Sequence, residues 1–286
     1  MAGANRPTFL EEWCKENNVP VHEGRERYMA FVILACISAN TNLSSCLVFK
    51  GGNALRFVHQ SPRSTKDLDF TVKSDILADD EEKIRSVMDI ALKWGFQRYQ
   101  VKAKCQRVKR NPSRRDATRP TYDVKIGYLY PDDRYFNDFE NRNVATVIPV
   151  EISFNDLVCE DEPYTPDNQH AFAVRVCTLE DITAEKLRSL LQQPKRNRNR
   201  CQDVFDLARI YKESLNQLDL TKVAKFFREK CQIREVEPKR CAFNDEVREM
   251  AEVDYETRIK SQAPKDFIPF DEAWNSTIHL VDRLNL

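Results

Sequence analysis

The stretch KGGNALRFVHQSPRSTKDLDFTV, residues 50–72, most constrains how this chain folds. Residues 46–50 predict a short strand, the adjacent Gly51–Gly52 predict a turn, and residues 53–59 predict a short helix. Residues 66–72 alternate strictly between apolar and polar side chains, which is the pattern of a strand with one buried face. The chain has only six glycines, so two in succession indicate a specific backbone shape.

This stretch suits phosphate chemistry. Backbone N–H groups at a glycine turn and at a helix start converge on an anion, so residues 50–53 (Lys50, Gly51, Gly52 and Asn53) are candidates for binding a triphosphate. Asp67 and Asp69 project from the same face of one strand, about 6–7 Å apart. Their carboxylates can hold Mg²⁺, which takes one or two carboxylates together with substrate phosphates and water. Either feature alone is often a plain turn or a solvated sheet face, but their combination favours a catalytic site.

Three further residues are candidates for the same site. Glu151 lies in a predicted strand and supplies a third acid, and three acids around one or two metal ions suit nucleotidyl transfer. Lys186 lies within the apolar stripe of a predicted helix over 179–193, where a lysine either snorkels to water or meets an anion. Asp203 borders the buried face of a predicted helix over 201–214, with Asp206 farther round, and suits either catalysis or pairing with a neighbouring Lys or Arg.

Strand patterns dominate the first part of the chain and helical patterns the second. The remaining strands are expected over 98–108, 121–130 and 145–154, and the remaining helices over 24–40, 80–94, 219–230, 243–261 and 271–284. The loop 159–170 contains two prolines and a cluster of acids. We therefore expect an α+β domain over residues 1–165, followed by a helical domain over 166–286.

The charge balance limits what can be said about nucleic acid. The 286 residues include 45 Lys and Arg and 45 Asp and Glu, so the net charge is zero and only local basic clusters can contact RNA. One cluster lies in a predicted hairpin and comprises Lys102, Lys104, Arg107, Lys109, Arg110, Arg114, Arg115 and Arg119. A second comprises Lys195, Arg196, Arg198 and Arg200. The alternatives for these clusters are a solvated loop or a surface for an acidic partner protein.

Cysteine usage and hydropathy bear on the compartment. The nine cysteines are scattered, and no CxxC motif occurs. Reduced thiols in a cytosolic protein are therefore a better interpretation than a zinc site or a disulfide framework. No stretch of about 18 apolar residues predicts a membrane span, and the N-terminus lacks the pattern of a secretory signal.

Five segments in order, KGGNALR, STKDLDF, PVEIS, TLEDITAEKLRSLL and RCQDVFDL, resemble the AbiEii/AbiGii-type nucleotidyltransferases. These are toxins of type IV toxin–antitoxin and abortive-infection systems, within the DNA polymerase β-like superfamily. The resemblance covers about residues 46–212. It implies a minimal nucleotidyltransferase fold, a mixed sheet with flanking helices, before a helical C-terminal half. It also implies an NTP substrate such as ATP, Mg²⁺ with Mn²⁺ as the alternative, and a cytoplasmic toxin or phage-defence effector with an antitoxin partner.

The resemblance also assigns residues. Gly51, Gly52 and Asn53 match the glycine-turn motif, and Asp67 and Asp69 match the metal-binding acids. Glu151 matches the third acid, Lys186 the helical lysine and Asp203 the acid of the final motif. Two positions depart from the family pattern, because Asn53 stands where Ser or Thr is usual and Glu151 stands where Asp is usual. These departures bear on efficiency and nucleotide choice more than on the fold.

The leading hypothesis is an Mg²⁺-dependent enzyme that moves an NMP from an NTP to an acceptor hydroxyl. The expected acceptor is RNA, in particular tRNA, with a protein side chain as the other option. A non-catalytic module that binds nucleotide or RNA is the alternative, motivated by Asn53. A metal-dependent nuclease is less favoured, because Glu151 is followed by Ile152 and Ser153 rather than by a lysine two residues on.

Overall fold

The computed structural model of the chain describes residues 9–74, 77–114, 120–154, 156–168 and 171–286. Two compact units make up the chain. Unit 1 comprises Met1–Phe49, Lys66–Asp156 and Pro163–Val176, and unit 2 comprises Lys50–Thr65, Leu157–Glu162 and Cys177–Leu286. We expected a single boundary between residues 165 and 166. Residues 50–65 and 157–162 group with the C-terminal helices, and the helix within 50–65 packs against one of those helices. The division into two domains at residues 165 and 166 stays a prediction.

A seven-stranded mixed sheet has the strand order β3-β4-β5-β2-β1-β7-β6. The strands are β1 (Leu47–Lys50), β2 (Leu68–Val72), β3 (Lys102–Asn111), β4 (Thr121–Leu129), β5 (Val147–Ser153), β6 (Asp161–Tyr164) and β7 (Val174–Cys177). The pairs β2–β5 and β1–β7 are parallel, whereas β3–β4 and β4–β5 are antiparallel. This arrangement confirms the expected α+β class with a mixed sheet. The short strands β6 and β7 were not expected.

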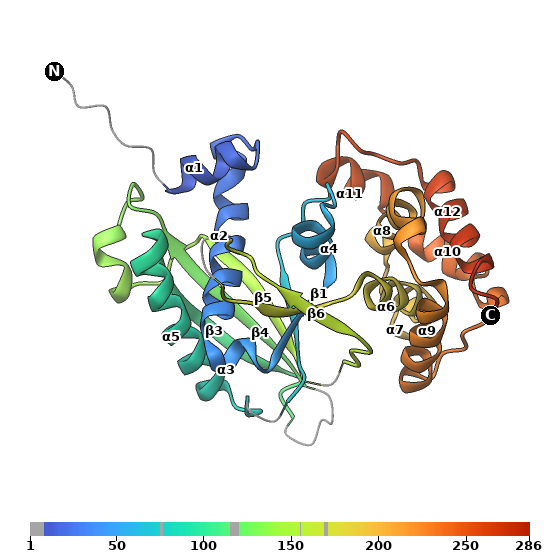
Figure 1. Cartoon of the computed structure of the whole chain (residues 1–286), viewed down its shortest axis with the longest axis horizontal. Helices are drawn as coiled ribbons and strands as arrows, with labels where there is room; N and C mark the ends of the chain where they lie inside the picture. The colour runs from blue at the N-terminus through green and yellow to red at the C-terminus, as the bar shows by residue number, and fades with distance from the viewer. Residues whose placement is uncertain (1–8, 75–76, 115–119, 155, 169–170) are drawn as a thin grey trace. The chain divides into compact units, whose positions relative to one another are not determined.

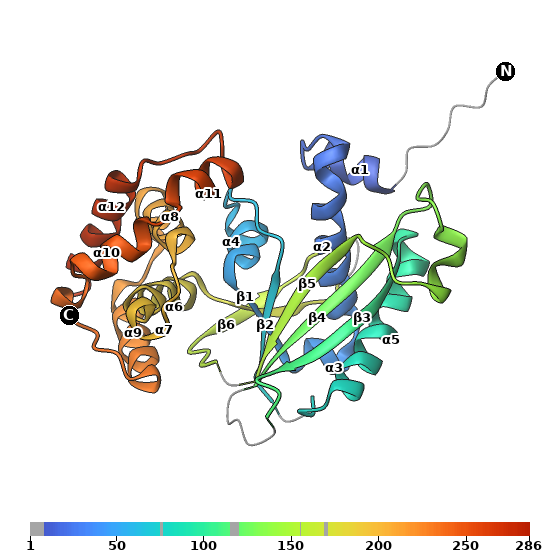
Figure 2. The ribbon, with the colours of Figure 1, turned by 180° about the vertical axis from the view of Figure 1, so that it is seen from behind.

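One face of the sheet forms the core of unit 1. The alternate residues Val124 and Ile126 of β4, and Val150 and Ile152 of β5, are buried on this face. Helices α2 (Val21–Ala39) and α5 (Glu81–Tyr99) lie against this face (Figure 1). The opposite face of β3, β4, β5 and β2 is toward the viewer in Figure 2. The remaining helices of this unit are α1 (Phe9–Glu16), α3 (Thr41–Ser44) and the 3₁₀ helix η1 (Phe136–Asn141).

Side chains of α5 form hydrogen bonds with backbone groups along the edge strand β3. The Asp89 carboxylate accepts a hydrogen bond from the Cys105 amide at 2.7 Å, and the Glu81 carboxylate accepts one from the Arg110 amide at 2.9 Å. Arg85 donates to the Cys105 carbonyl. An unpaired strand edge is a template for association with other chains, and these contacts satisfy part of that edge within the unit.

Unit 2 is helical. Its helices are α4 (Gly51–His59), α6 (Leu179–Leu191), α7 (Gln193–Arg196), α8 (Cys201–Arg209), η2 (Ile210–Ser214), η3 (Leu215–Gln217), α9 (Leu220–Arg234), η4 (Arg240–Ala242), α10 (Asp245–Glu252), α11 (Tyr255–Gln262) and α12 (Phe270–Asp282). Helix α6 packs against α4, α8 and α9, and α12 packs against α8. The continuous helix expected over 243–261 is instead two helices, because Asp254 has a left-handed φ of 59°. Among the described residues, no helix is long and apolar enough to cross a membrane.

Candidate active site

Two of the predicted acids are neighbours in the sheet. Strands β2 and β5 run parallel, and their register pairs Asp69 with Glu151. Adjacent strands lie about 4.8 Å apart, and paired residues point to the same face of the sheet. Both side chains are half-buried on the face opposite the α2–α5 core. Glu151, 82 positions farther along the chain, is therefore the neighbour of Asp69 in the sheet, and its role as a third metal-binding acid stays a prediction.

A third carboxylate extends this row. Asp123 of β4 is the antiparallel partner of Glu151 and is exposed on the same face. The sequence analysis did not single out Asp123. The alternation in β4 placed it on the polar side of its strand, but no local signal showed that β4 pairs with β5 in this register.

Asp67 lies just before β2, two residues from Asp69, and is exposed. Across the described ranges, no group of three or more His, Cys, Asp or Glu side chains is arranged to hold a metal ion. The meeting of all three predicted acids around one ion therefore stays a prediction. The donor set itself fits a hard cation, because Asp67, Asp69 and Glu151 offer only carboxylate oxygens and Mg²⁺ completes its shell with phosphates and water.

The acid-bearing end of β2 lies beside the end of β1. The two strands are neighbours in the sheet, and the amide of Lys73, just after β2, donates to the carbonyl of Cys46, just before β1, at 2.8 Å. Contact between the end of one strand and the start of the other indicates an antiparallel pair. The start of β2 is therefore beside the end of β1 in the sheet.

The glycine turn opens helix α4. Gly51 has a φ of 75°, a left-handed conformation that glycine adopts without steric cost. Lys50 precedes the helix in an extended conformation, and its side chain makes no capping hydrogen bond. The first N–H groups of a helix have no partner within the helix, and such a helix start has the chemistry of an anion site.

Residues 63–65 pack behind this turn. The buried Asn53 side chain donates through Nδ2 to the Thr65 carbonyl at 3.3 Å, so it joins the turn to the segment before β2. A Cβ atom placed on Gly52 would lie 2.6 Å from Nη2 of Arg63 and 3.3 Å from Cγ2 of Thr65. Gly52 is therefore required for close approach to this segment rather than for an unusual φ.

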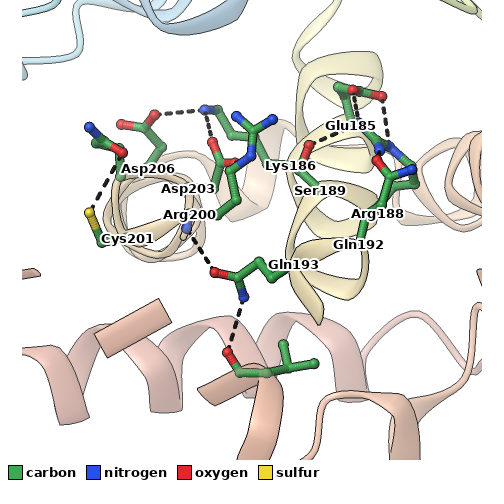
Figure 3. A network of polar contacts seen from close by, with 12 residues as sticks. Glu185, Lys186, Arg188, Ser189, Gln192, Gln193, Arg200, Cys201, Asp203 and Asp206 are labelled. Carbon is green, nitrogen blue, oxygen red and sulfur yellow. Dashed lines mark hydrogen bonds and ion pairs between the residues drawn. The ribbon is translucent and has the colours of Figure 1, made fainter. Parts of the chain in front are cut away.

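Lys186 lies in a buried ion-pair network. Its Nζ donates to Oδ1 of Asp203 at 2.8 Å and to Oδ2 of Asp206 at 2.7 Å, from α6 across to α8 (Figure 3). Arg63 donates to both oxygens of Asp206, through Nε at 2.8 Å and Nη2 at 2.7 Å. We call these four residues (Arg63, Lys186, Asp203 and Asp206) the Asp206 network. All four are buried, including Asp206, which the helical pattern had placed farther from the buried face.

Asp206 and Lys186 stabilise each other's charged forms. Burial acts to raise the pKa of Asp206, but the positive charges of Arg63 and Lys186 outweigh it and lower that pKa to about 2. Burial acts in the opposite sense on Lys186, and the charges of Asp203 and Asp206 outweigh it, so the pKa of the lysine is raised. A buried charge is tolerated only when it is paired and hydrogen-bonded. Here the lysine ammonium favours the ionised carboxylate of Asp206, and that carboxylate favours the protonated lysine.

A second buried lysine in unit 2 has different surroundings. Lys230 of α9 lies 3.0 Å from Oδ2 of Asp181 and also donates to the Leu157 carbonyl. Asp181 in turn accepts a hydrogen bond from the Cys159 amide at 2.7 Å. This arrangement ties residues 157–159 to α6 and α9, and it provides a matched comparison for Lys186.

A mixed sheet with flanking helices is the fold expected of a nucleotidyltransferase. The sequence model of the family described as "Nucleotidyl transferase AbiEii toxin, Type IV TA system" matches residues 32–276. The chain belongs to this family, and it is a nucleotidyltransferase.

Two solved structures from Helicobacter show the same fold. A nucleotidyltransferase candidate from H. pylori and JHP933 from Helicobacter pylori each share 16% identity and a TM-score of 0.50 with this chain. Each match covers 91% of this chain, and 92% and 91% of those chains respectively. The nucleotidyltransferase toxin MenT4 from Mycobacterium tuberculosis H37Rv shares 15% identity at a TM-score of 0.49, covering 92% of this chain and 94% of that chain. No curated protein matches the chain.

The low pKa of Asp206 predicts an acid-sensitive contribution to stability. Because this pKa lies below the ordinary value of 3.8, the stabilisation is present above about pH 4 and is lost as the pH falls towards 2. Over that interval, the free energy of unfolding should fall more steeply for the wild type than for Asp206→Asn, by on the order of 2 kcal/mol. Urea unfolding at a series of pH values measures this difference. Parallel curves for the two proteins would contradict it.

Proposed function

We propose that this nucleotidyltransferase uses Mg²⁺ to transfer an NMP from an NTP to a hydroxyl of RNA, with tRNA as the leading acceptor. We also propose that it acts in the cytoplasm as a toxin or phage-defence effector and is held in check by an antitoxin. The observation that carries the chemistry is the register pairing of Asp69 with Glu151 on adjacent parallel strands. Membership of the AbiEii toxin family supports the biological role.

The proposed reaction assigns a role to each residue of the site. Backbone N–H groups of Gly51, Gly52 and Asn53 hold the triphosphate. Asp67, Asp69 and Glu151 are the residues that would hold Mg²⁺, which when bound neutralises phosphate charge and makes the acceptor hydroxyl more acidic. Glu151 takes the proton of that hydroxyl. The hydroxyl oxygen then forms a bond to the α-phosphorus, the bond from that phosphorus to the bridging oxygen breaks, and pyrophosphate leaves.

Lys186 is proposed to supply positive charge to the triphosphate. A lysine ammonium carries three donor hydrogens, and the hydrogen bonds to Asp203 and Asp206 use two of them. We propose that the third donates to a phosphate oxygen of the triphosphate. Asp203 touches Lys186 directly, so we propose that Asp203 acts by fixing the position of the ammonium group.

The basic clusters support RNA as the acceptor to different degrees. In the hairpin, Lys102 and Lys104 donate to carbonyls of residues 136–140, and Arg110 pairs with Asp79 at 3.0 Å. Arg107 and Lys109 remain exposed on β3, while Arg115 and Arg119 lie outside the described residues. In the second cluster Lys195 pairs with Glu235, and Arg196 and Arg198 are exposed. Exposed cations of this kind neutralise backbone phosphates.

Removing one carboxylate of the paired acids tests the chemistry. Asp69→Asn should reduce label transfer from NTP by at least about 100-fold, because an amide is a poor ligand for a hard cation. The assay incubates each radiolabelled NTP with Mg²⁺ and total RNA or protein. Asp132→Asn makes the same change at an exposed carboxylate that pairs with Arg25, and should leave transfer unchanged. Nucleotide binding that ignores Mg²⁺, without label transfer to any acceptor, would favour the non-catalytic module instead.

A comparison of two buried lysines distinguishes a role of Lys186 in NTP binding from a role in stability alone. Lys186→Met and Lys230→Met each leave carboxylates unpaired in unit 2, so both should lower the free energy of unfolding by about 3–5 kcal/mol. Only Lys186→Met should also weaken NTP binding, by about tenfold or more, measured by calorimetry on the folded fraction at low temperature. Equal loss of NTP binding in both variants would show that Lys186 has only a structural role.

A further inference from the structure

Arg63 is the residue that joins the glycine turn to the Asp206 network. Its guanidinium lies so close to Gly52 that a Cβ atom there would be 2.6 Å from Nη2. The same Nη2 donates to Oδ2 of Asp206 at 2.7 Å. One planar group therefore contacts both the start of α4 and the ion pairs between α6 and α8. The sequence analysis gave Arg63 no role.

The guanidinium is held firmly. Two parallel hydrogen bonds to one carboxylate fix the orientation of an arginine in a way that a single bond cannot. A further contact runs from Nη1 to the side-chain oxygen of Gln262 at 3.4 Å, and the amide of Ser64 donates to the Gln262 carbonyl at 2.8 Å. With only 6% of its surface exposed, Arg63 cannot swing into solvent without breaking these contacts.

We propose that Arg63 is a positioning residue for the nucleotide. It fixes the backbone of Gly51–Asn53 against the Asp206 network, so that the N–H groups of the turn keep the direction in which they bind phosphate. This inference rests on the proposed use of the turn as the triphosphate site. Arg63 acts through the turn, so its loss weakens nucleotide binding and leaves the reacting atoms in place.

The contact also explains why the glycine motif and the Asp203–Asp206 segment belong to one site. Asp206 is 143 positions from Arg63 in the chain, yet its carboxylate determines where the guanidinium lies against Gly52. Lys186 shares the same carboxylate. Arg63 and Lys186 are therefore held at a fixed separation, and the residues proposed to contact the triphosphate are positioned by one buried acid.

The test replaces Arg63 with lysine. Arg63→Lys keeps the charge but loses the forked pair of hydrogen bonds. We expect the KM for NTP to rise about tenfold while kcat changes by less than about twofold. We also expect faster hydrogen exchange of the peptide covering residues 51–65 in the nucleotide-free protein. Arg209→Lys is the matched control, because Arg209 is an ion-paired arginine on α8 that contacts Glu213 and Asp266, and it should change neither quantity.

A second variant approaches the contact from the other side. Gly52→Ala places a methyl group against the Arg63 guanidinium and should weaken nucleotide affinity in the wild-type background. In the double variant with Arg63→Lys, the fold-loss of nucleotide affinity should be smaller than the product of the two single fold-losses. The reason is that the guanidinium that collides with the new methyl group is no longer present. Strictly multiplicative effects would show that the two residues do not act through their contact.

The outcomes separate this inference from the proposed function. An unchanged KM and unchanged exchange in Arg63→Lys would overturn the positioning role. So would a fall in kcat at constant KM, because Arg63 would then act at the reacting atoms. If the wild type transfers no nucleotide, the proposed function fails. Exchange of the 51–65 peptide, together with calorimetric affinity for a non-hydrolysable NTP analogue, then decides the role of Arg63 alone.

Discussion

The parallel pairing of β2 with β5 places two carboxylates side by side. Leu68 and Phe70 of β2 point into the core with Val150 and Ile152 of β5, and a slip of β2 by one residue would expose Leu68 and Phe70. The core therefore fixes the register that pairs Asp69 with Glu151. Like charges directly opposite each other destabilise a sheet, and Asp123 adds a third on the next strand. A bound cation would offset this repulsion, which gives the proposed metal site a physical purpose.

In unit 2, the Asp206 network likewise brings together side chains that are distant in the sequence. It brings together a loop residue, Arg63, and side chains from two helices that lie more than 100 positions away. Because Arg63 pairs with Asp206 of α8 and α4 packs against α6, residues 50–65 belong to the helical unit although strands of unit 1 precede and follow them. The glycine turn thus takes its support from unit 2 and its chain connection from β1.

The sequence predicted the strands whose position follows from a local pattern of apolar and polar residues. The strict alternation over residues 66–72, 121–130 and 145–154 located β2, β4 and β5 to within about two residues, because each strand has one face in the core. The alternation also placed Asp69 on the polar face of β2, and two successive glycines in a chain with only six indicated the turn. Arg63 had no such signal, since its partner is remote in the sequence. Asp206 was misplaced because a helical wheel assigns acids to the solvent, and it cannot show that an arginine and a lysine neutralise one in the interior.

A crystal structure with Mg²⁺ and a non-hydrolysable NTP analogue tests the central claim most directly. The claim predicts an ion with carboxylate oxygens of Asp69 and Glu151 at about 2.0–2.1 Å. It also predicts phosphate oxygens on the same ion and hydrogen bonds from the backbone of Gly51–Asn53 to the triphosphate. An ion bound away from the Asp69–Glu151 pair, or a triphosphate held by other residues, would contradict it.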